Sequence, residues 1–176
     1  MATINGKACV ANSTPVDKVF SNGKQVYGRN LLTGTSETRQ EKTGGDYLIS
    51  TIGMFAPRKG NEYTATLQVL ENDHPFVLQV WEMNKWGARI GFVIGTSITA
   101  TGIAKISFTA PESDEYDLLG VQLAWTNGED TGSYAWSMAK VSSGTISTPW
   151  TPAPEDVLKG DITTPKNLVE SQSYIK

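Results

Sequence analysis

The sequence contains few of the residues from which active sites and metal sites are most often built. Among 176 residues there is one cysteine and one histidine. Two such residues are too few for a standard zinc centre, which needs three or four ligands of this kind. Cys9 cannot form an internal disulfide, and we expect it to be half-buried in an N-terminal strand. His74 lies beside Asp73 in a turn, where a structural role is much commoner than a catalytic dyad.

Clustered positive charge and long apolar runs are also missing. The net charge is −3, and Lys and Arg form no stripe of the kind that binds phosphate groups. We therefore expect neither nucleic acid nor an anionic membrane as a partner. No run approaches the ~18 apolar residues of a membrane span, and residues 1–7 do not resemble a signal peptide. No glycine motif that cradles phosphate is present.

Carboxylates offer no distinctive catalytic or metal-binding pattern. A glycosidase needs two of them about 5–9.5 Å apart, and Glu82 with Glu115 or Asp117 is a pair that any β protein could offer. The acidic segment 111–117 matches no standard calcium loop and is typical of a solvated surface loop. We predict no catalytic residue, no metal site and no cofactor.

The residues that are abundant favour β structure. Thr, Ser, Val, Ile and aromatic residues are frequent, and 17 glycines punctuate the chain. Apolar and polar residues alternate in short runs between turn signals. The predicted strands cover residues 63–70, 76–83, 88–94, 103–109, 118–125 and 133–141. This pattern predicts an all-β protein, a jelly-roll-like antiparallel β-sandwich.

The chain divides into three predicted parts. Residues 1–28 form an N-terminal β arm with a hairpin, because Asn22-Gly23 favours a tight turn between two short strands. Residues 29–157 form the sandwich, which ends in an extended, proline-rich segment over 148–156. Residues 158–176 are a polar linker or the start of a neighbouring domain.

The five tryptophans are the most informative residues. Trp125 shares a strand face with apolar residues and is expected in the core. Trp150 is expected to pack the C-terminal segment onto the sandwich. Trp81 shares its face with Val77, Gln79 and Met83, which is mixed enough to face solvent. Trp86 lies in a polar connection, where an aromatic ring is hard to bury.

Two further strands bear on which aromatic rings are exposed. The alternation over 88–94 places Ile90, Phe92 and Ile94 on one face. In the strand over 133–141, Tyr134 and Trp136 share one face and Ala135 lies on the other. Either face of that strand could form the core, so both alternatives stay open.

Exposed aromatic rings flanked by planar polar side chains are what a sugar ring requires, because it presents C–H groups to an aromatic face and hydroxyls at its edge. The competing interpretation is a protein interface, where Trp, Tyr and Arg are also enriched. The candidate ligand-binding residues are Trp81, Trp86, Tyr134, Trp136, Gln79, Arg89 and Gln122.

Two segments carry a family resemblance. The first resembles the entry to modules inserted in tail and baseplate proteins of phages infecting lactobacilli, lactococci and related Gram-positive bacteria, and it reads Lys18-Val-Phe-Ser-Asn-Gly-Lys-Gln-Val-Tyr-Gly-Arg-Asn-Leu-Leu32. The second resembles the exit from those modules, and it reads Met138-Ala-Lys-Val-Ser-Ser-Gly-Thr-Ile-Ser-Thr-Pro-Trp-Thr-Pro-Ala-Pro-Glu-Asp156. Tyr63-Thr64 after Gly60 resembles a strand start of the same family. A Lys-Leu-Glu-x-Gly step common in the family reads differently over 139–144, where the Glu is replaced.

The resemblance implies a jelly-roll fold similar to carbohydrate-binding modules. It also implies adhesion to host cell-wall polysaccharide from the virion tail, within an extended distal tail protein or an accessory baseplate protein that contacts other tail proteins. It transfers no ligand-binding residue and no calcium ligand. The alternatives are a structural baseplate module that docks a neighbouring tail protein, and a polysaccharide depolymerase.

Overall fold

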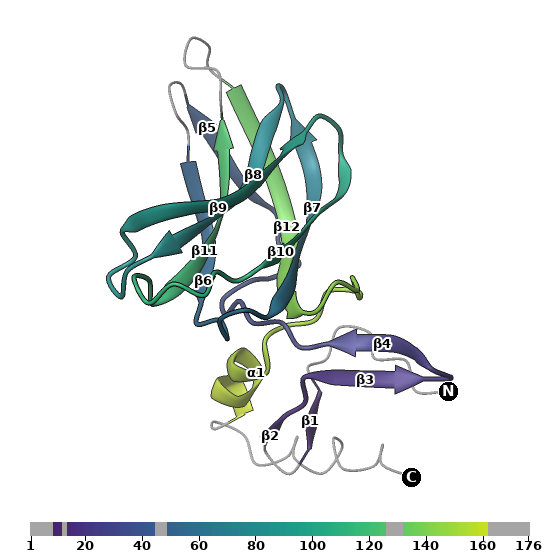
Figure 1. Ribbon diagram of the computed structural model, residues 1–176. Helices are drawn as coiled ribbons and strands as arrows, with labels where there is room; N and C mark the ends of the chain where they lie inside the picture. Colours follow the sequence, from purple (N-terminus) through teal and green to yellow (C-terminus); the bar gives the residue numbers. More distant parts are fainter. Residues whose placement is uncertain (1–8, 12–13, 45–48, 126–131, 162–176) are drawn as a thin grey trace.

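The computed structural model describes residues 9–11, 14–44, 49–125 and 132–161. Two four-stranded antiparallel sheets pack face to face within these ranges (Figure 1), which confirms the predicted all-β sandwich. The β7/β12 sheet has the spatial order β10 (Gly102–Thr109), β7 (Glu62–Asn72), β12 (Gly132–Ser143) and β5 (Gln40–Gly44). The β8/β11 sheet has the order β6 (Ile49–Phe55), β11 (Leu118–Trp125), β8 (Phe76–Met83) and β9 (Arg89–Ile98).

The core lies between the two sheets and is built from residues of every sandwich strand except β5. Burying a large apolar side chain stabilises the fold by about 1.5–3 kcal/mol, so these residues supply much of the driving force. They include Tyr63, Ala65, Leu67 and Val69 of β7, Phe76, Leu78 and Val80 of β8, and Leu119, Val121 and Leu123 of β11. The side chain of Trp125, predicted to belong here, lies outside the described part of the structure.

A bulge in β9 changes which of its residues face outward. The register between β8 and β9 shifts after Val80, so that Val80 pairs with Ile94 while Trp81 pairs with Phe92. Ile94 packs against the core and Phe92 is 57% exposed. The prediction that Ile90, Phe92 and Ile94 share one face is therefore wrong, because the extra residue in the bulge reverses the alternation.

A second bulge lies in β12. Its register against β7 shifts between Ser137 and Lys140, and Met138 has a φ of 53°. Before the bulge Tyr134 joins the core, and after it Ala139 and Val141 do. The sequence left open which face of this strand forms the core. The face of Tyr134 does so before the bulge, and the opposite face does so after it.

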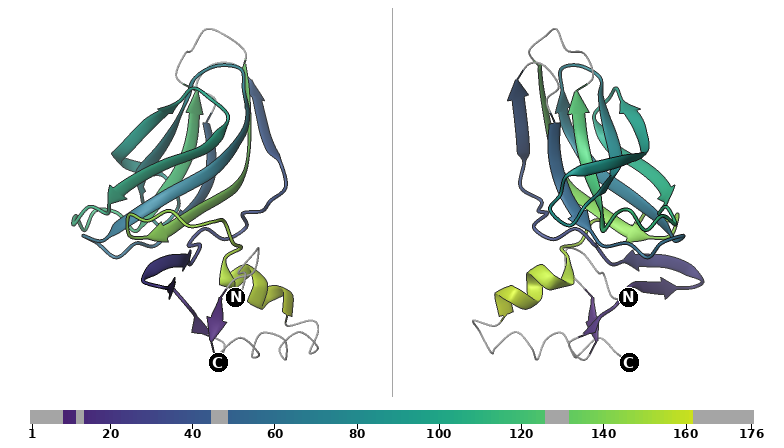
Figure 2. Two further views of the ribbon diagram at one scale, coloured as in Figure 1. Left: turned by 90° about the vertical axis from the view of Figure 1, so that its right-hand side faces the viewer. Right: turned by 60° about the vertical axis from the view of Figure 1, so that its left-hand side comes forward.

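The N-terminal hairpin and the helix lie at the same end of the sandwich (Figure 2). The hairpin, β3 (Lys18–Ser21) and β4 (Lys24–Gly28), turns at Asn22-Gly23 with positive φ at both residues, as predicted. Two short strands precede it, β1 (Val10–Ala11) and β2 (Thr14–Pro15).

Helix α1 spans Pro154–Asp161, so the extended segment ends earlier than predicted. Proline is favoured at the first helical position because its missing N–H would have no partner there. Acidic residues follow in the first turn, where the helix dipole stabilises negative charge. Residues 162–176, the rest of the predicted polar C-terminal segment, lie outside the described residues.

The segments that enter and leave the sandwich bind each other, in what we call the clasp (residues 29–34 and 150–156). Arg29 pairs with Asp17 at 3.2 Å and also with Glu155. The backbone N–H of Gly34 donates to the Asp156 carboxylate at 2.8 Å. Trp150 Nε1 donates to the carbonyl of Ala139 at 3.1 Å, which confirms the predicted docking of this segment.

Lys140 is buried beside the clasp, with 1% of its surface exposed. Its Nζ donates to the Pro149 carbonyl at 2.7 Å and to Thr148 Oγ1 at 3.0 Å. The ammonium also lies 5.6 Å from the centroid of the Tyr27 ring. Burial lowers the pKa of Lys140 to about 8, because a low-dielectric environment disfavours the charged form.

This burial predicts a pH-dependent stability. The ordinary pKa of lysine is 10.5 and the folded value is about 8, so between these values the unfolded chain binds more protons. The free energy of unfolding should therefore rise with pH, by about 2–3 kcal/mol between pH 7 and pH 10. Urea unfolding of wild type and Lys140→Met at both pH values isolates the effect. Parallel pH dependence in the two proteins would contradict it.

Candidate functional site

The outer face of the β8/β11 sheet gathers most of the predicted site residues. Phe76, Leu78 and Val80 point into the core, so Gln79 and Trp81 point away from it, as predicted. Cross-strand pairing then places Gln122 beside Gln79 and Phe92 beside Trp81. We call this group the Trp81 face and define it as Gln79, Trp81, Arg89, Phe92, Gln122 and Thr51.

An aromatic pair with a cation beside it forms the centre of the Trp81 face. The rings of Trp81 and Phe92 meet edge to face with centroids 5.1 Å apart. The Arg89 guanidinium carbon lies 4.6 Å from the Trp81 centroid, within the range of a cation–π contact. Sequence reasoning missed Phe92. Gly91 and Gly95 on either side of it were the available signal, since glycine inside a strand often marks a bulge.

Planar polar side chains form a connected row beside the rings. An Arg89 Nη donates to Gln122 Oε1, and Gln122 Nε2 donates to Thr51 Oγ1 at 2.9 Å. Gln79 is 8% exposed and Gln122 4%, so both side chains are buried. Partial burial lowers the pKa of Arg89, but a guanidinium remains charged at physiological pH.

Gly120 lies where the surrounding side chains leave no room for a larger residue. It pairs with Trp81 across β8 and β11, and a Cβ at this position would lie 2.3 Å from Met83 Cε. Real Cβ atoms do not approach that closely, so any larger residue would displace Met83. Gly120 therefore contributes no side chain next to Trp81, and Met83 fills the space that one would take.

Trp86 stands at one end of this face, in the turn between β8 and β9. It is 79% exposed, as its polar surroundings predicted. Asn84 Oδ1 fixes the turn by accepting from the N–H groups of Trp86 at 3.0 Å and Ala88 at 2.9 Å. A Cβ on Gly87 would lie 3.3 Å from Met54 of β6. Because β6 is two strands from β8, the turn bends back over the outer face.

Tyr134 and Trp136 lie elsewhere. Tyr134 is 1% exposed and stacks on Phe76 with centroids 5.0 Å apart, so it belongs to the core and cannot touch a ligand in this arrangement. Trp136 is partly buried and lines a separate cavity at the edge of the sandwich. The structure therefore brings Trp81, Gln79, Arg89 and Gln122 together on one face. Trp86 lies in the turn that follows β8, and the other two candidates lie apart.

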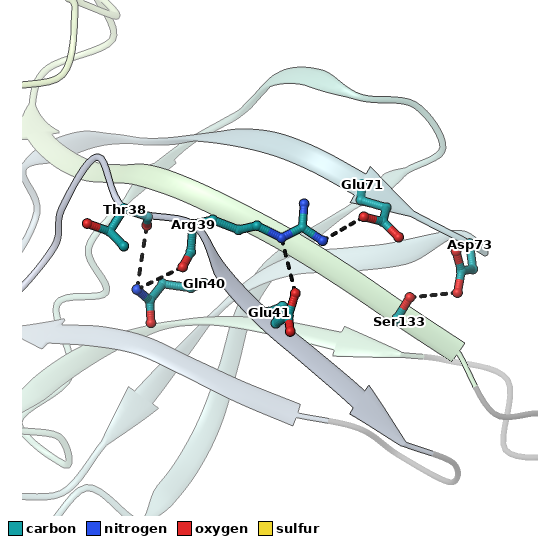
Figure 3. Close-up of polar contacts among 7 residues, drawn as sticks. All are labelled: Thr38, Arg39, Gln40, Glu41, Glu71, Asp73 and Ser133. Carbon is teal, nitrogen blue, oxygen red and sulfur yellow. Dashed lines mark hydrogen bonds and ion pairs between the residues drawn. The ribbon is translucent and has the colours of Figure 1, made fainter.

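The outer face of the β7/β12 sheet has a different character. Arg39 reaches across it to Glu41 at 3.1 Å and Glu71 at 2.6 Å, while Ser133 donates to Asp73 at 2.6 Å (Figure 3). The side chains of Arg39, Glu41 and Glu71 are solvent-exposed, and ion pairs of this kind contribute little to stability. We therefore take the ion pairs as a solvated surface and the aromatic face as the candidate site.

The described ranges contain neither a cluster of metal-ligating side chains nor a helix that could span a membrane. No group of three or more His, Cys, Asp or Glu residues there is arranged to hold a metal ion. The acidic loop contributes an exposed ion pair between Asp114 and Lys59 at 2.5 Å. No helix of the described chain is long and apolar enough to cross a bilayer.

Comparison with known proteins gives distant structural likenesses only. No family model matches the sequence and no curated protein matches it. The tailspike protein 4 enzymatically active domain of bacteriophage CBA120 superimposes with a TM-score of 0.46 at 10% identity, over 65% of this chain and 21% of that one. A structure described as CBM4 gives 0.42 at 15% identity, over 65% of this chain and 94% of that one. The xylan-binding CBM22-1 domain of Paenibacillus barcinonensis Xyn10C gives 0.36 at 10% identity, over 68% and 94%. This chain thus spans about a fifth of the tailspike chain, and none of these likenesses assigns a functional residue.

Proposed function

We propose that this protein is a non-catalytic saccharide-binding module of a phage tail, which attaches the virion to polysaccharide of the host cell wall. The observation that carries the proposal is the Trp81 face, where two aromatic rings, a guanidinium and two amides lie side by side. The phage context is supported by the resemblance of residues 18–32 and 138–156 to segments of tail and baseplate proteins.

The chemistry of the face suits a sugar. The C–H surface of a pyranose packs on an aromatic ring, and its hydroxyls need donors and acceptors in the plane of its edge. Trp81 and Phe92 supply the apolar surface. Arg89 supplies a planar polar group, and the buried amide of Gln122 accepts a hydrogen bond from it and so orients it. An open site of this kind buries little area, so we expect weak binding per module and an increase through multiple copies on one virion.

Binding to intact host cell walls or purified wall polysaccharide is the direct test. The purified chain, fused to a fluorescent protein, should be retained by host walls and not by walls of an unrelated bacterium. Absence of retention at high wall concentration would overturn the proposal. Release of soluble sugar from the wall would instead identify a depolymerase.

Trp86→Ala should weaken wall binding about fivefold to tenfold without lowering the melting temperature. The indole is 79% exposed, so its removal costs little core packing, while exposed Trp side chains at binding sites often contribute 1 kcal/mol or more. Wall retention against protein concentration measures the change. The matched control is Ile146→Ala, another exposed apolar residue, which should bind as wild type does. Unchanged wall binding by Trp86→Ala combined with failed assembly onto tail proteins would favour the structural-module alternative.

A further inference from the structure

The edge of the sandwich holds a cavity whose lining, apart from Thr51, lies outside the Trp81 face. This cavity, of about 170 Å³, lies between the segment that precedes β5, the edge strand β6 and the bulged part of β12. Clefts that hold drug-sized ligands are about 300–1,000 Å³. The volume therefore suits one ring rather than a chain of several.

The lining of this cavity is polar but uncharged. One indole, from Trp136, forms part of the wall, together with the apolar side chain of Ile52. The other lining residues are four with hydroxyl groups, one amide residue and three without polar side chains: Thr35, Ser36, Thr51, Ser137, Gln40, Gly34, Met138 and Ala139. None of the described residues that line the cavity carries a charge. An anionic ligand would be left without a counter-charge, whereas a neutral hydroxylated ring finds both an apolar surface and hydrogen-bonding groups.

The backbone around the cavity is held in an uncommon conformation. Met138, which lines it, has a φ of 53°, and its N–H donates to the carbonyl of Ser36 across the cavity wall at 2.8 Å. The other non-glycine residue with positive φ in the described chain, Asn22, lies in a hairpin turn that requires it. A conformation like that of Met138 costs about 1–3 kcal/mol, and such residues concentrate at ligand-binding positions.

The cavity adjoins the Trp81 face through one residue. Thr51 lines the cavity and also accepts the hydrogen bond from Gln122 that ends the Arg89–Gln122 row. The polar groups of the outer face therefore continue over β6 to the cavity mouth. A saccharide lying on the outer face could extend one residue or branch in this direction.

We propose that this cavity is a second subsite, which holds a single neutral sugar residue against Trp136. The sugar class rests on the function proposed above, whereas the preference for a neutral ring rests on the lining of the cavity itself. Gln40 is the residue that we expect to bind the hydroxyl edge, because it is exposed and lines the cavity. Among the described residues, its amide nitrogen makes long contacts of 3.5 and 3.3 Å with the Thr38 and Arg39 carbonyls (Figure 3).

Nuclear magnetic resonance of the whole chain tests the subsite. Each tryptophan gives one indole N–H signal, and Trp136→Phe identifies that of Trp136. Glucose, galactose, rhamnose and N-acetylglucosamine are titrated separately, with glucuronate as the charged control. At least one neutral sugar should shift the Trp136 indole and the Gln40 amide saturably, and glucuronate should not. Gln40→Ala should weaken this binding about fivefold, the effect of one hydrogen bond.

The same titration in Trp81→Ala separates the two proposals. Shifts at Trp136 that persist in this variant support an independent subsite. If neutral sugars or wall fragments shift Trp81 and Trp86 but never Trp136, the subsite is refuted and the outer-face site stands. If Trp136 alone responds, the subsite stands and the outer-face site fails. Absence of any indole shift overturns both.

Discussion

Replacing Asn30 with alanine should lower the free energy of unfolding by about 3–5 kcal/mol. The side chain is fully buried and accepts from the backbone N–H groups of Leu32 and Val141 at 3.1 and 3.2 Å. Its Nδ2 donates to the carbonyls of Ala139 and Thr151, both at 3.2 Å. The substitution would leave these buried groups without their Asn30 partner, and each buried unsatisfied group costs about 1–3 kcal/mol.

Urea unfolding at neutral pH measures this change, with Asn61→Ala as the matched control. Asn61 is exposed, and its contacts in the described structure are made by its backbone, so its replacement should change stability by less than about 0.5 kcal/mol. Similar midpoints for the two variants would show that the clasp contributes little. Asn30 lies within the first segment of the family resemblance and Thr151 within the second, so the result also tests whether these motifs act together in folding.

Trp81→Ala should reduce wall binding about thirtyfold, the largest loss that we expect from any single replacement on the outer face. The indole contacts Phe92 and the Arg89 guanidinium, so its removal takes away the stacking surface and also the support that orients both neighbours. Central aromatic residues of binding sites commonly contribute about 2 kcal/mol, and each 1.4 kcal/mol is tenfold in affinity.

Two further variants make this result interpretable. Phe20→Ala removes an aromatic ring that is 60% exposed on the N-terminal hairpin, and its binding should equal that of wild type. Trp81→Phe keeps an aromatic ring and should retain part of the affinity, which distinguishes lost stacking from lost folding. Equal binding by Trp81→Ala and wild type, with both folded, would remove Trp81 from the site.

The sequence predicted the strands of the sandwich more reliably than their faces. Alternation holds along β7 from Tyr63 to Val69 and along β11 from Leu119 to Leu123. Register shifts occur beside both rows, but within these ranges the extra residue lies on the partner strand, β12 or β6. Alternation failed for Phe92 and could not decide for Tyr134, because one inserted residue in β9 or β12 reverses the alternation. A bulge is set by pairing with a neighbouring strand, and that neighbour is distant in the sequence.

In the candidate site, too, features set by the local sequence were predictable, and features set by pairing between distant strands were not. Trp86 was predictable, since Asn84 and Gly87 mark a turn in which a ring stays exposed. The contact between Arg89 and Gln122 was not, because these residues are 33 positions apart and meet only through the order of strands in the sheet. Thr51 lies on a strand that the sequence analysis did not identify.

The clasp also has a mechanical consequence. Arg29 pairs with Asp17, which precedes the sandwich in the sequence, and with Glu155, which follows it. The two segments of the chain that enter and leave the sandwich are therefore linked at its base. Tension applied between these two points would load the clasp first, and the sheets would lie outside the line of force. A sandwich attached in this way can stay bound to a surface under tension, and its own β-strands bear no force until the clasp opens.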